Sequence, residues 1–290
     1  MTSRLAVGTV QFGLPYGVAN QAGQVSQGAA EAILMRAFAA GVDTLDTAVA
    51  YGTSEACLGR AGVSSWRVIT KLPALPADAT DVEGWVRSEV HGSLQRLSIP
   101  RLDGLLLHKP ADLLGPAGGS YQQALQLLKQ EGVVRSVGIS IYDPAELDSV
   151  CSCWQPDIVQ APFNVLDRRL LSSGWLARLV ERGVRIHVRS VFLQGLLLLP
   201  SERRPAWFDR WRPLLDRWID WCREQQTSPL RAALAFAQAQ PGIERLVVGL
   251  DSVAQLDEIL AALAADTSPA PDDLYSDDLD LLEPSRWELI

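Results

Sequence analysis

The stretch Asp46-Thr-Ala-Val-Ala-Tyr-Gly-Thr53 follows a short apolar run and places a carboxylate five residues before a tyrosine. Lys71 ends a second apolar run, and His108 ends a third. Polar residues of different chemistry therefore lie at or just past the ends of three successive β-like segments. In a parallel α/β barrel all such ends open onto one rim, where active sites are built. We expect Asp46, Tyr51, Lys71 and His108 to converge there.

The surrounding chain alternates short β-branched runs with longer helical patterns. Such alternation implies right-handed parallel crossovers, and eight units close a barrel. We therefore expect an α/β fold, a (β/α)8 TIM barrel that forms one catalytic domain over residues 1–265. The expected strands are Leu5–Val10, Val42–Thr47, Trp66–Leu72, Leu102–His108, Val133–Ser140, Ile158–Ala161, Val184–Ser190 and Arg245–Gly249. The expected helices include Gln27–Ala40, Val82–Leu97, Tyr121–Gln130, Pro144–Val150, Gly174–Glu181 and Ser252–Ala264, the last with Ser252 as its N-cap.

An irregular insertion follows the seventh strand. It starts with the proline-rich segment Leu196–Pro213 and continues as helical stretches to Gln226 and over Pro229–Ala239. An insertion that follows a strand lies on the functional rim, so this segment is a candidate substrate loop. Four of its tryptophans have the spacing of one helix face, which favours core packing, with a ligand-facing wall as the alternative: Trp207, Trp211, Trp218 and Trp221.

Composition limits the classes of function and location. The chain has 290 residues, 48% of them hydrophobic, and a net charge of −8, which argues against a nucleic-acid surface. Residues 266–290 hold most of the negative charge, and we expect a solvated acidic tail packing on or near the barrel rim. No apolar run is long enough to span a membrane, and the four cysteines form no metal-binding pattern, so we expect a cytoplasmic protein without metal. We expect a monomer or weak homo-oligomer.

The four rim residues suit one kind of chemistry. A free tyrosine has a pKa of about 10. A nearby cationic lysine favours its phenolate, and a carboxylate keeps that lysine charged. A histidine can direct a substrate oxygen through a hydrogen bond. A carbonyl that receives a hydride develops negative charge on oxygen, which the tyrosine hydroxyl and the imidazole can meet. Each residue alone has a structural alternative, Asp46 as a helix cap or Lys71 as a loop charge, but their joint placement favours catalysis.

The chain resembles the aldo-keto reductases over nearly its whole length and in the family's order. The matching pieces are Gly8-Thr-Val-Gln11, Leu45–Gly52, Ile69-Thr-Lys71, Leu102–His108, Gly132–Ser140, Gln160, Ser190–Leu197 and Val247–Gly249 through Glu258. The resemblance implies an eight-fold barrel and nicotinamide-dependent reduction of an aldehyde or ketone, or oxidation of the corresponding alcohol or sugar. It places the catalytic tetrad on Asp46, Tyr51, Lys71 and His108, with Tyr51 as the general acid and base.

Cofactor positions carried over by the resemblance are less uniform. Ser140 and Gln160 match residues that bind the nicotinamide carboxamide, whereas Ile141 replaces the usual asparagine and Arg189 the usual stacking aromatic. The remaining expected contacts are Thr9, then Ser190, Leu193 and Gly195 near the pyrophosphate, and Gly249, Asp251, Gln255 and Glu258 near the adenosine.

The resemblance implies NADP(H), but the adenosine segment carries an unusual charge. Gly249–Glu258 contains no lysine or arginine, and Asp251 lies near the expected 2′-phosphate, where a carboxylate suits a ribose 2′-hydroxyl. NAD(H) is therefore possible. The alternative is that Asp251 starts the next helix and faces water.

Two other functions remain open from sequence. One is a nicotinamide-binding regulatory or sensor barrel with little turnover. The other is a lyase or isomerase with Lys71 as a Schiff-base lysine, although Asp46 would keep that lysine charged. The expected partner is a small carbonyl or sugar-like molecule.

Overall fold

Eight parallel strands close into a barrel in chain order in the computed structural model, which describes residues 4–20, 22–264 and 270–287. The last strand pairs with the first, Leu5 opposite Leu246. This confirms the predicted (β/α)8 fold. The strands are β1 (Leu5–Gly8), β2 (Thr44–Asp46), β3 (Arg67–Leu72), β4 (Leu102–Leu107), β5 (Val134–Ser140), β6 (Ile158–Pro162), β7 (Arg185–Arg189) and β8 (Ile243–Gly249).

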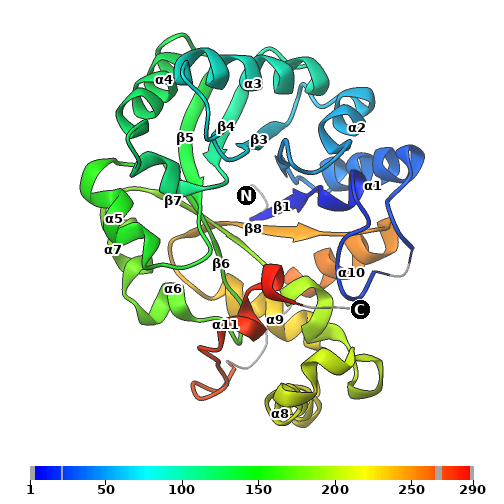
Figure 1. The fold of residues 1–290 in the computed structure, drawn as a ribbon. Coiled ribbons are helices and arrows are strands. Elements are labelled where there is room, and N and C mark those ends of the chain that lie inside the picture. Colours follow the sequence, from blue (N-terminus) through cyan, green and yellow to red (C-terminus); the bar gives the residue numbers. More distant parts are fainter. Residues whose placement is uncertain (1–3, 21, 265–269, 288–290) are drawn as a thin grey trace.

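Helices surround the barrel, as Figure 1 shows. They are α1 (Gln27–Ala39), α2 (Ser54–Ala61), α3 (Val82–Leu97), α4 (Gly118–Gln130), α5 (Glu146–Cys153), α6 (Arg169–Ser172), α7 (Trp175–Glu181), α9 (Pro229–Gln238) and α10 (Val253–Leu263). Ser252 accepts a hydrogen bond from the backbone N–H of Gln255 and caps α10, as predicted. The four-residue α6 was not predicted from the sequence.

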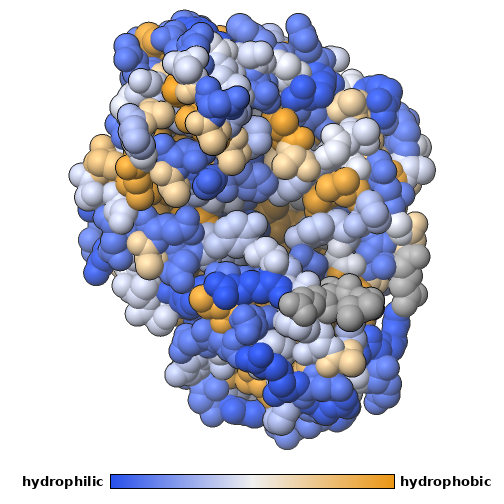
Figure 2. All heavy atoms as spheres, viewed as in Figure 1, coloured by the Kyte–Doolittle hydropathy of each residue, from blue (hydrophilic) through white to orange (hydrophobic). Residues whose placement is uncertain are grey.

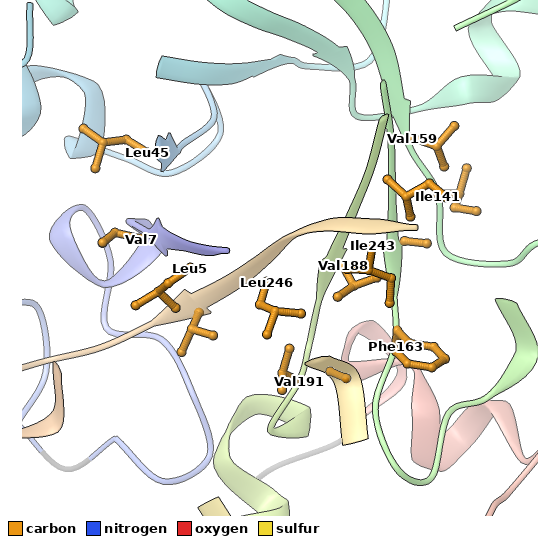
Figure 3. Close-up of a cluster of buried hydrophobic side chains, with 14 of the residues drawn as sticks. Leu5, Val7, Leu45, Ile141, Val159, Phe163, Val188, Val191, Ile243 and Leu246 are labelled. Atoms are coloured by element: carbon orange, nitrogen blue, oxygen red, sulfur yellow. The ribbon is translucent and has the colours of Figure 1, made fainter. Parts of the chain in front are cut away.

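Side chains alternate between the two faces of each strand, and the two faces differ in chemistry. Outward-facing Leu, Val and Ile residues form the main core between barrel and helices, part of which is drawn in Figure 3 with labelled side chains from β1, β2, β6, β7 and β8. A separate, small apolar cluster of Ile69, Leu106 and Ile158 lies in the barrel interior. The upper part of the interior is polar and includes Asp46 and Lys71, so the buried interior already contains predicted site residues.

One glycine is required by the close approach of strands β5 and β6. A Cβ at Gly138 would lie 2.0 Å from the carbonyl oxygen of Ile158, so any other residue would force the two strands apart. The close pairing keeps Ser140 opposite Gln160, and both are fully or nearly fully buried. The spacing of the barrel wall therefore determines where these two polar side chains meet.

The insertion after β7 folds as short helical turns, η3 (Leu193–Leu198), η4 (Ser201–Arg203) and η5 (Ala206–Trp211), followed by α8 (Arg212–Glu224), which lies away from the barrel in Figure 1. The expected single helix face is wrong, because Trp207 and Trp211 belong to η5 and Trp218 and Trp221 to α8. Trp218 is fully buried and Trp211 nearly so. These tryptophans pack in the core, as the favoured interpretation held.

The acidic segment packs against the barrel through apolar side chains. It contains α11 (Leu279–Leu282) and η6 (Pro284–Arg286), and Leu274, Leu281 and Leu282 are buried. Asp278 accepts a hydrogen bond from the Trp211 indole at 3.0 Å. Residues 270–287 thus pack through their leucines, while acids such as Asp272 and Asp273 remain exposed. The ends of the tail, 266–269 and 288–290, and the domain limit at residue 265 lie outside the described residues.

Helix length in the described part of the chain also bears on membranes. None of these helices combines the length and the apolar character that crossing a bilayer would require.

Candidate active site

Four polar side chains reach one end of the barrel from three adjacent strands. Asp46 is the last residue of β2, Lys71 lies one residue before the end of β3, and His108 directly follows β4. Tyr51 lies in the loop between β2 and α2. Because β2, β3 and β4 are neighbours in the sheet, the structure brings the four predicted catalytic residues together.

A buried ion pair lies beneath the tyrosine. Lys71 Nζ donates to Asp46 Oδ1 at 2.5 Å and to the Thr47 carbonyl at 2.9 Å, with no part of the Lys71 side chain exposed. Gln160 Nε2 donates to the other Asp46 oxygen at 2.6 Å. Burial by itself lowers the pKa of Lys71, but the Asp46 charge, the interaction with Tyr51 and the hydrogen bond to Asp46 together outweigh it, and the pKa is raised. Lys71 is therefore a fixed cation.

The tyrosine and the histidine face the opening above this pair. Lys71 Nζ lies 5.0 Å from the centre of the Tyr51 ring, and the Tyr51 and His108 ring centres are 6.0 Å apart at an angle of 76°. Burial, followed by the charges of Lys71 and Arg189, lowers the pKa of His108 to about 4. His108 is therefore neutral at physiological pH and has one N–H to donate.

Two glycines hold the Tyr51 loop against the loop after β1. A Cβ at Gly13 would meet the Tyr51 carbonyl oxygen at 1.8 Å. Gly52 has φ +55°, and a Cβ there would lie 2.6 Å from the Gly13 carbonyl oxygen. Only residues without a Cβ allow this contact, so the position of Tyr51 depends on both glycines.

A cavity of about 440 Å³ extends from the tetrad toward α10. Figure 2 shows the corresponding face of the molecule hollowed near its centre. Its size falls in the range of small-molecule and cofactor sites. Besides Asp46, Tyr51 and His108, it is lined by these predicted cofactor residues: Thr9, Arg189, Ser190, Gly195, Gly249, Asp251, Gln255 and Glu258.

The other three predicted cofactor residues do not line the cavity. Ser140 and Gln160 are buried below it, and the Ser140 hydroxyl donates to Gln160 Oε1 at 3.3 Å. Leu193 is buried in the core, and its backbone N–H donates a hydrogen bond to the Ser190 carbonyl at 2.9 Å. Thr9 does line the cavity, although its hydroxyl donates to the Asp46 carbonyl at 2.9 Å. Thr9 therefore also supports the strand that carries Asp46.

The far end of the cavity has unsatisfied polar groups that suit a bound nucleoside. Asp251 Oδ1 and Gln11 Oε1 are buried without a hydrogen-bond partner. Burial raises the pKa of the Asp251 carboxyl. Buried acceptors of this kind are costly unless a ligand supplies donors. A ribose hydroxyl can supply them, so these residues fit a nicotinamide dinucleotide.

Several lining residues were missed from the sequence, because loops between strands give no periodic signal. Tyr16 belongs to the long loop after β1, and its hydroxyl accepts a hydrogen bond from Gln194 Nε2 at 2.9 Å. Tyr142 lies two residues past the end of β5, a position that could have been noticed because rim residues follow strand ends. Gln11 also lines the cavity, as does Phe192, which belongs to the Ser190–Gly195 segment expected near the pyrophosphate.

A buried lysine–carboxylate pair thus lies beneath a tyrosine beside a cavity of cofactor size, at one end of a (β/α)8 barrel. Comparison with known families identifies the class of protein, since the model of the aldo/keto reductase family matches residues 4–271. The chain belongs to the aldo/keto reductase family, whose members are oxidoreductases that act on carbonyl or alcohol groups and use nicotinamide cofactors.

Individual relatives are distant. The chain is 28% identical to an NADH-specific methylglyoxal reductase of Escherichia coli (strain K12), over 68% of the chain and 65% of that protein. It is 32% identical to aflatoxin B1 aldehyde reductase member 2 of Rattus norvegicus, over 60% of the chain and 51% of that protein. The matches to these two thus span about half to two thirds of their length. L-galactose dehydrogenase of Arabidopsis thaliana is 29% identical, with 89% of the chain and 85% of that protein covered.

A solved structure shows the same fold. The holo form of aldo-keto reductase AKR11C1 from Bacillus halodurans superimposes with a TM-score of 0.72. The match covers 94% of this chain and 90% of the other at 22% identity.

Proposed function

We propose that this protein catalyses the reversible, nicotinamide-dependent reduction of an aldehyde or ketone, with Tyr51 as general acid and base. The observation that carries the proposal is the fully buried Lys71–Asp46 pair, with Lys71 Nζ 5.0 Å from the Tyr51 ring. A fixed cation at this position stabilises a tyrosinate, which a tyrosine must become when it gives up its proton.

The residues divide the work as follows. A bound reduced nicotinamide supplies a hydride to the carbonyl carbon. As the carbonyl π bond breaks, its oxygen takes the proton of the Tyr51 hydroxyl, and Lys71 stabilises the phenolate that remains. Neutral His108 donates its N–H to the same oxygen and fixes its direction. In alcohol oxidation the Tyr51 phenolate accepts the proton.

The two other functions fit this geometry less well. A Schiff-base lysine needs a neutral, accessible amine, whereas Asp46 keeps Lys71 cationic and burial keeps it inaccessible. A regulatory barrel requires cofactor binding but no oriented proton donor, and a complete set of four groups at the cavity mouth favours turnover.

Replacement of Tyr51 tests the proposal. We expect Tyr51→Phe to lower carbonyl reduction by two or more orders of magnitude, roughly the loss of one positioned donor to a developing oxyanion. Cofactor binding, followed through tryptophan fluorescence, should change little because the ring remains. Wild-type protein is first screened against aldehydes, ketones and sugars with NADH and NADPH. Retention of more than about a tenth of wild-type turnover in Tyr51→Phe would remove Tyr51 from this role.

We propose further that NADH is accepted and preferred. The carboxylate of Asp251, with its buried unpartnered Oδ1, lies at the adenosine end of the cavity. A ribose 2′-hydroxyl can donate to it, whereas a 2′-phosphate would meet a like charge. Similarity to an NADH-specific reductase supports the same assignment.

A further inference from the structure

Arg189 presents a cation to the cavity at its catalytic end. It is the last residue of β7, and Nη2 donates to the Ile141 carbonyl at 2.9 Å. Nη1 donates to the Ser190 hydroxyl at 3.3 Å. The guanidinium carbon lies 4.6 Å from the centre of the Tyr142 ring. The backbone and the ring together hold the guanidinium in place before any ligand binds.

This guanidinium has no counter-ion in the part of the chain that the structure describes. Within residues 4–20, 22–264 and 270–287 no carboxylate forms an ion pair with Arg189, and its two hydrogen-bond partners are neutral. An arginine has five N–H donors in a planar fork, so donors remain for a ligand. Lys71, by contrast, is matched by Asp46 and has no exposed surface. Arg189 is thus the unmatched positive charge of the cavity wall.

The position of Arg189 relates it to the reacting carbonyl. Arg189, Tyr142, Tyr51 and His108 line the same cavity of about 440 Å³. The Arg189 charge also contributes to the lowered pKa of His108, in agreement with their place in the lining of one cavity. A molecule whose carbonyl oxygen is held by Tyr51 and His108 therefore has Arg189 within reach of its other end.

We propose that Arg189 forms an anion-binding subsite and that this enzyme selects carbonyl substrates that carry a carboxylate. The selection of substrates rests on the proposed function, whereas anion binding does not. A planar carboxylate matches the guanidinium fork with two parallel hydrogen bonds. A phosphate fits less well, because the single guanidinium balances only one negative charge. Tyr142 provides an apolar face beside the bound group.

A pair of matched substrates tests the selection. 4-Formylbenzoate and its methyl ester have the same aldehyde and nearly the same shape, but only the first is charged. We expect wild type to favour the acid in kcat/KM. In Arg189→Met the acid-to-ester ratio should fall by about tenfold or more, while Arg189→Lys, which keeps the charge, should retain part of it. The ratio cancels any effect of the substitution on cofactor handling, since both substrates share that step.

Arg223→Met provides the matched control for net charge. Arg223 lies on α8, is exposed, and pairs only with Asp220 among the described residues. The Arg223→Met substitution removes the same unit of charge outside the cavity lining, so the acid-to-ester ratio should stay at the wild-type value. A fall equal to that of Arg189→Met would mean that overall charge, not a subsite, sets the preference and would overturn the proposal.

A binding measurement makes the subsite independent of turnover. Calorimetric titration with benzoate and with benzamide should show tighter binding of benzoate to wild type and loss of that difference in Arg189→Met. If benzoate binds in this way but no aldehyde is reduced, the anion subsite stands and the proposed reductase activity fails. If wild type reduces both aldehydes equally well and binds benzoate no better than benzamide, the reductase stands and the subsite is refuted. In that case Arg189 is a cofactor contact, as the resemblance implied.

Discussion

Removing one partner of the Lys71–Asp46 pair should lower the free energy of unfolding more than removing both charges at once. Lys71→Met leaves the Asp46 carboxylate buried with only the Gln160 amide as a donor, and Asp46→Asn leaves Lys71 as a buried cation without a counter-ion. Removing one partner of a buried pair typically costs about 3–5 kcal/mol. Each single variant should therefore lose roughly that amount.

The double variant Asp46→Asn/Lys71→Met contains no buried charge at this site. Methionine fills much of the lysine volume, and the asparagine can still bond Gln160, so the loss should be smaller than the sum of the two single losses by about 2 kcal/mol or more. For a domain of this size each single variant should melt roughly 10 °C lower.

Denaturant and thermal unfolding, followed by the fluorescence of the nine tryptophans, measure these differences. Arg87→Met is the control, because Arg87 forms a close ion pair with Glu131, at 2.7 Å, in a partly exposed position. That variant should unfold near the wild-type midpoint. Additivity of the two buried substitutions within about 0.5 kcal/mol would refute the reasoning, since it would mean that the two charges do not stabilise each other.

Two further outcomes follow from the site. Burial lowers the pKa of His108 to about 4, so between about pH 4 and pH 6.5 the unfolded chain binds a proton that the folded protein does not. The free energy of unfolding should therefore rise with pH over this window by at most about 3 kcal/mol, and His108→Gln should remove that part of the slope; equal slopes in both proteins would contradict it. At the other end of the cavity, Asp251→Ser should shift the ratio of NADH to NADPH dissociation constants toward NADPH by roughly tenfold, the equivalent of about 1.4 kcal/mol, measured by fluorescence titration. An unchanged ratio would show that Asp251 does not contact the ribose.

Much of the barrel could be predicted because its strands combine short β-branched runs with clear interruptions. The predicted and observed limits differ by a few residues at most, as at β8, which begins at Ile243 where Arg245 was expected. The single-turn helix α6 was missed because four residues cannot show a helical period.

The buried leucines of the acidic segment were not predicted because charge dominates its composition. Leu274, Leu281 and Leu282 are too few and too irregularly spaced to indicate burial, yet they anchor residues 270–287. Their contacts depend on the insertion and on loops far away in the sequence. Such long-range packing has no local signal.

The site was predictable to the level of its strand ends and no further. The rule that strand ends share a rim placed Asp46, Lys71 and His108 together, and the structure agrees. The same rule could not show that Gln160 bonds Asp46 across 114 residues, or that Arg189 lies on the ring of Tyr142. Those contacts depend on the directions in which neighbouring strands point their side chains.

The hydrogen bond from Gln160 to Asp46 has a consequence for engineering this enzyme. Asp46 accepts from Lys71 on β3 and from Gln160 on β6, and Gln160 in turn accepts from Ser140 on β5. A library that varies Ser140 or Gln160, the predicted nicotinamide contacts, should therefore also change the surroundings of Asp46 and Lys71 beneath Tyr51, the proposed proton donor. Improvements selected separately at the Ser140–Gln160 pair and around Asp46 and Lys71 should not add. These positions are best randomised together.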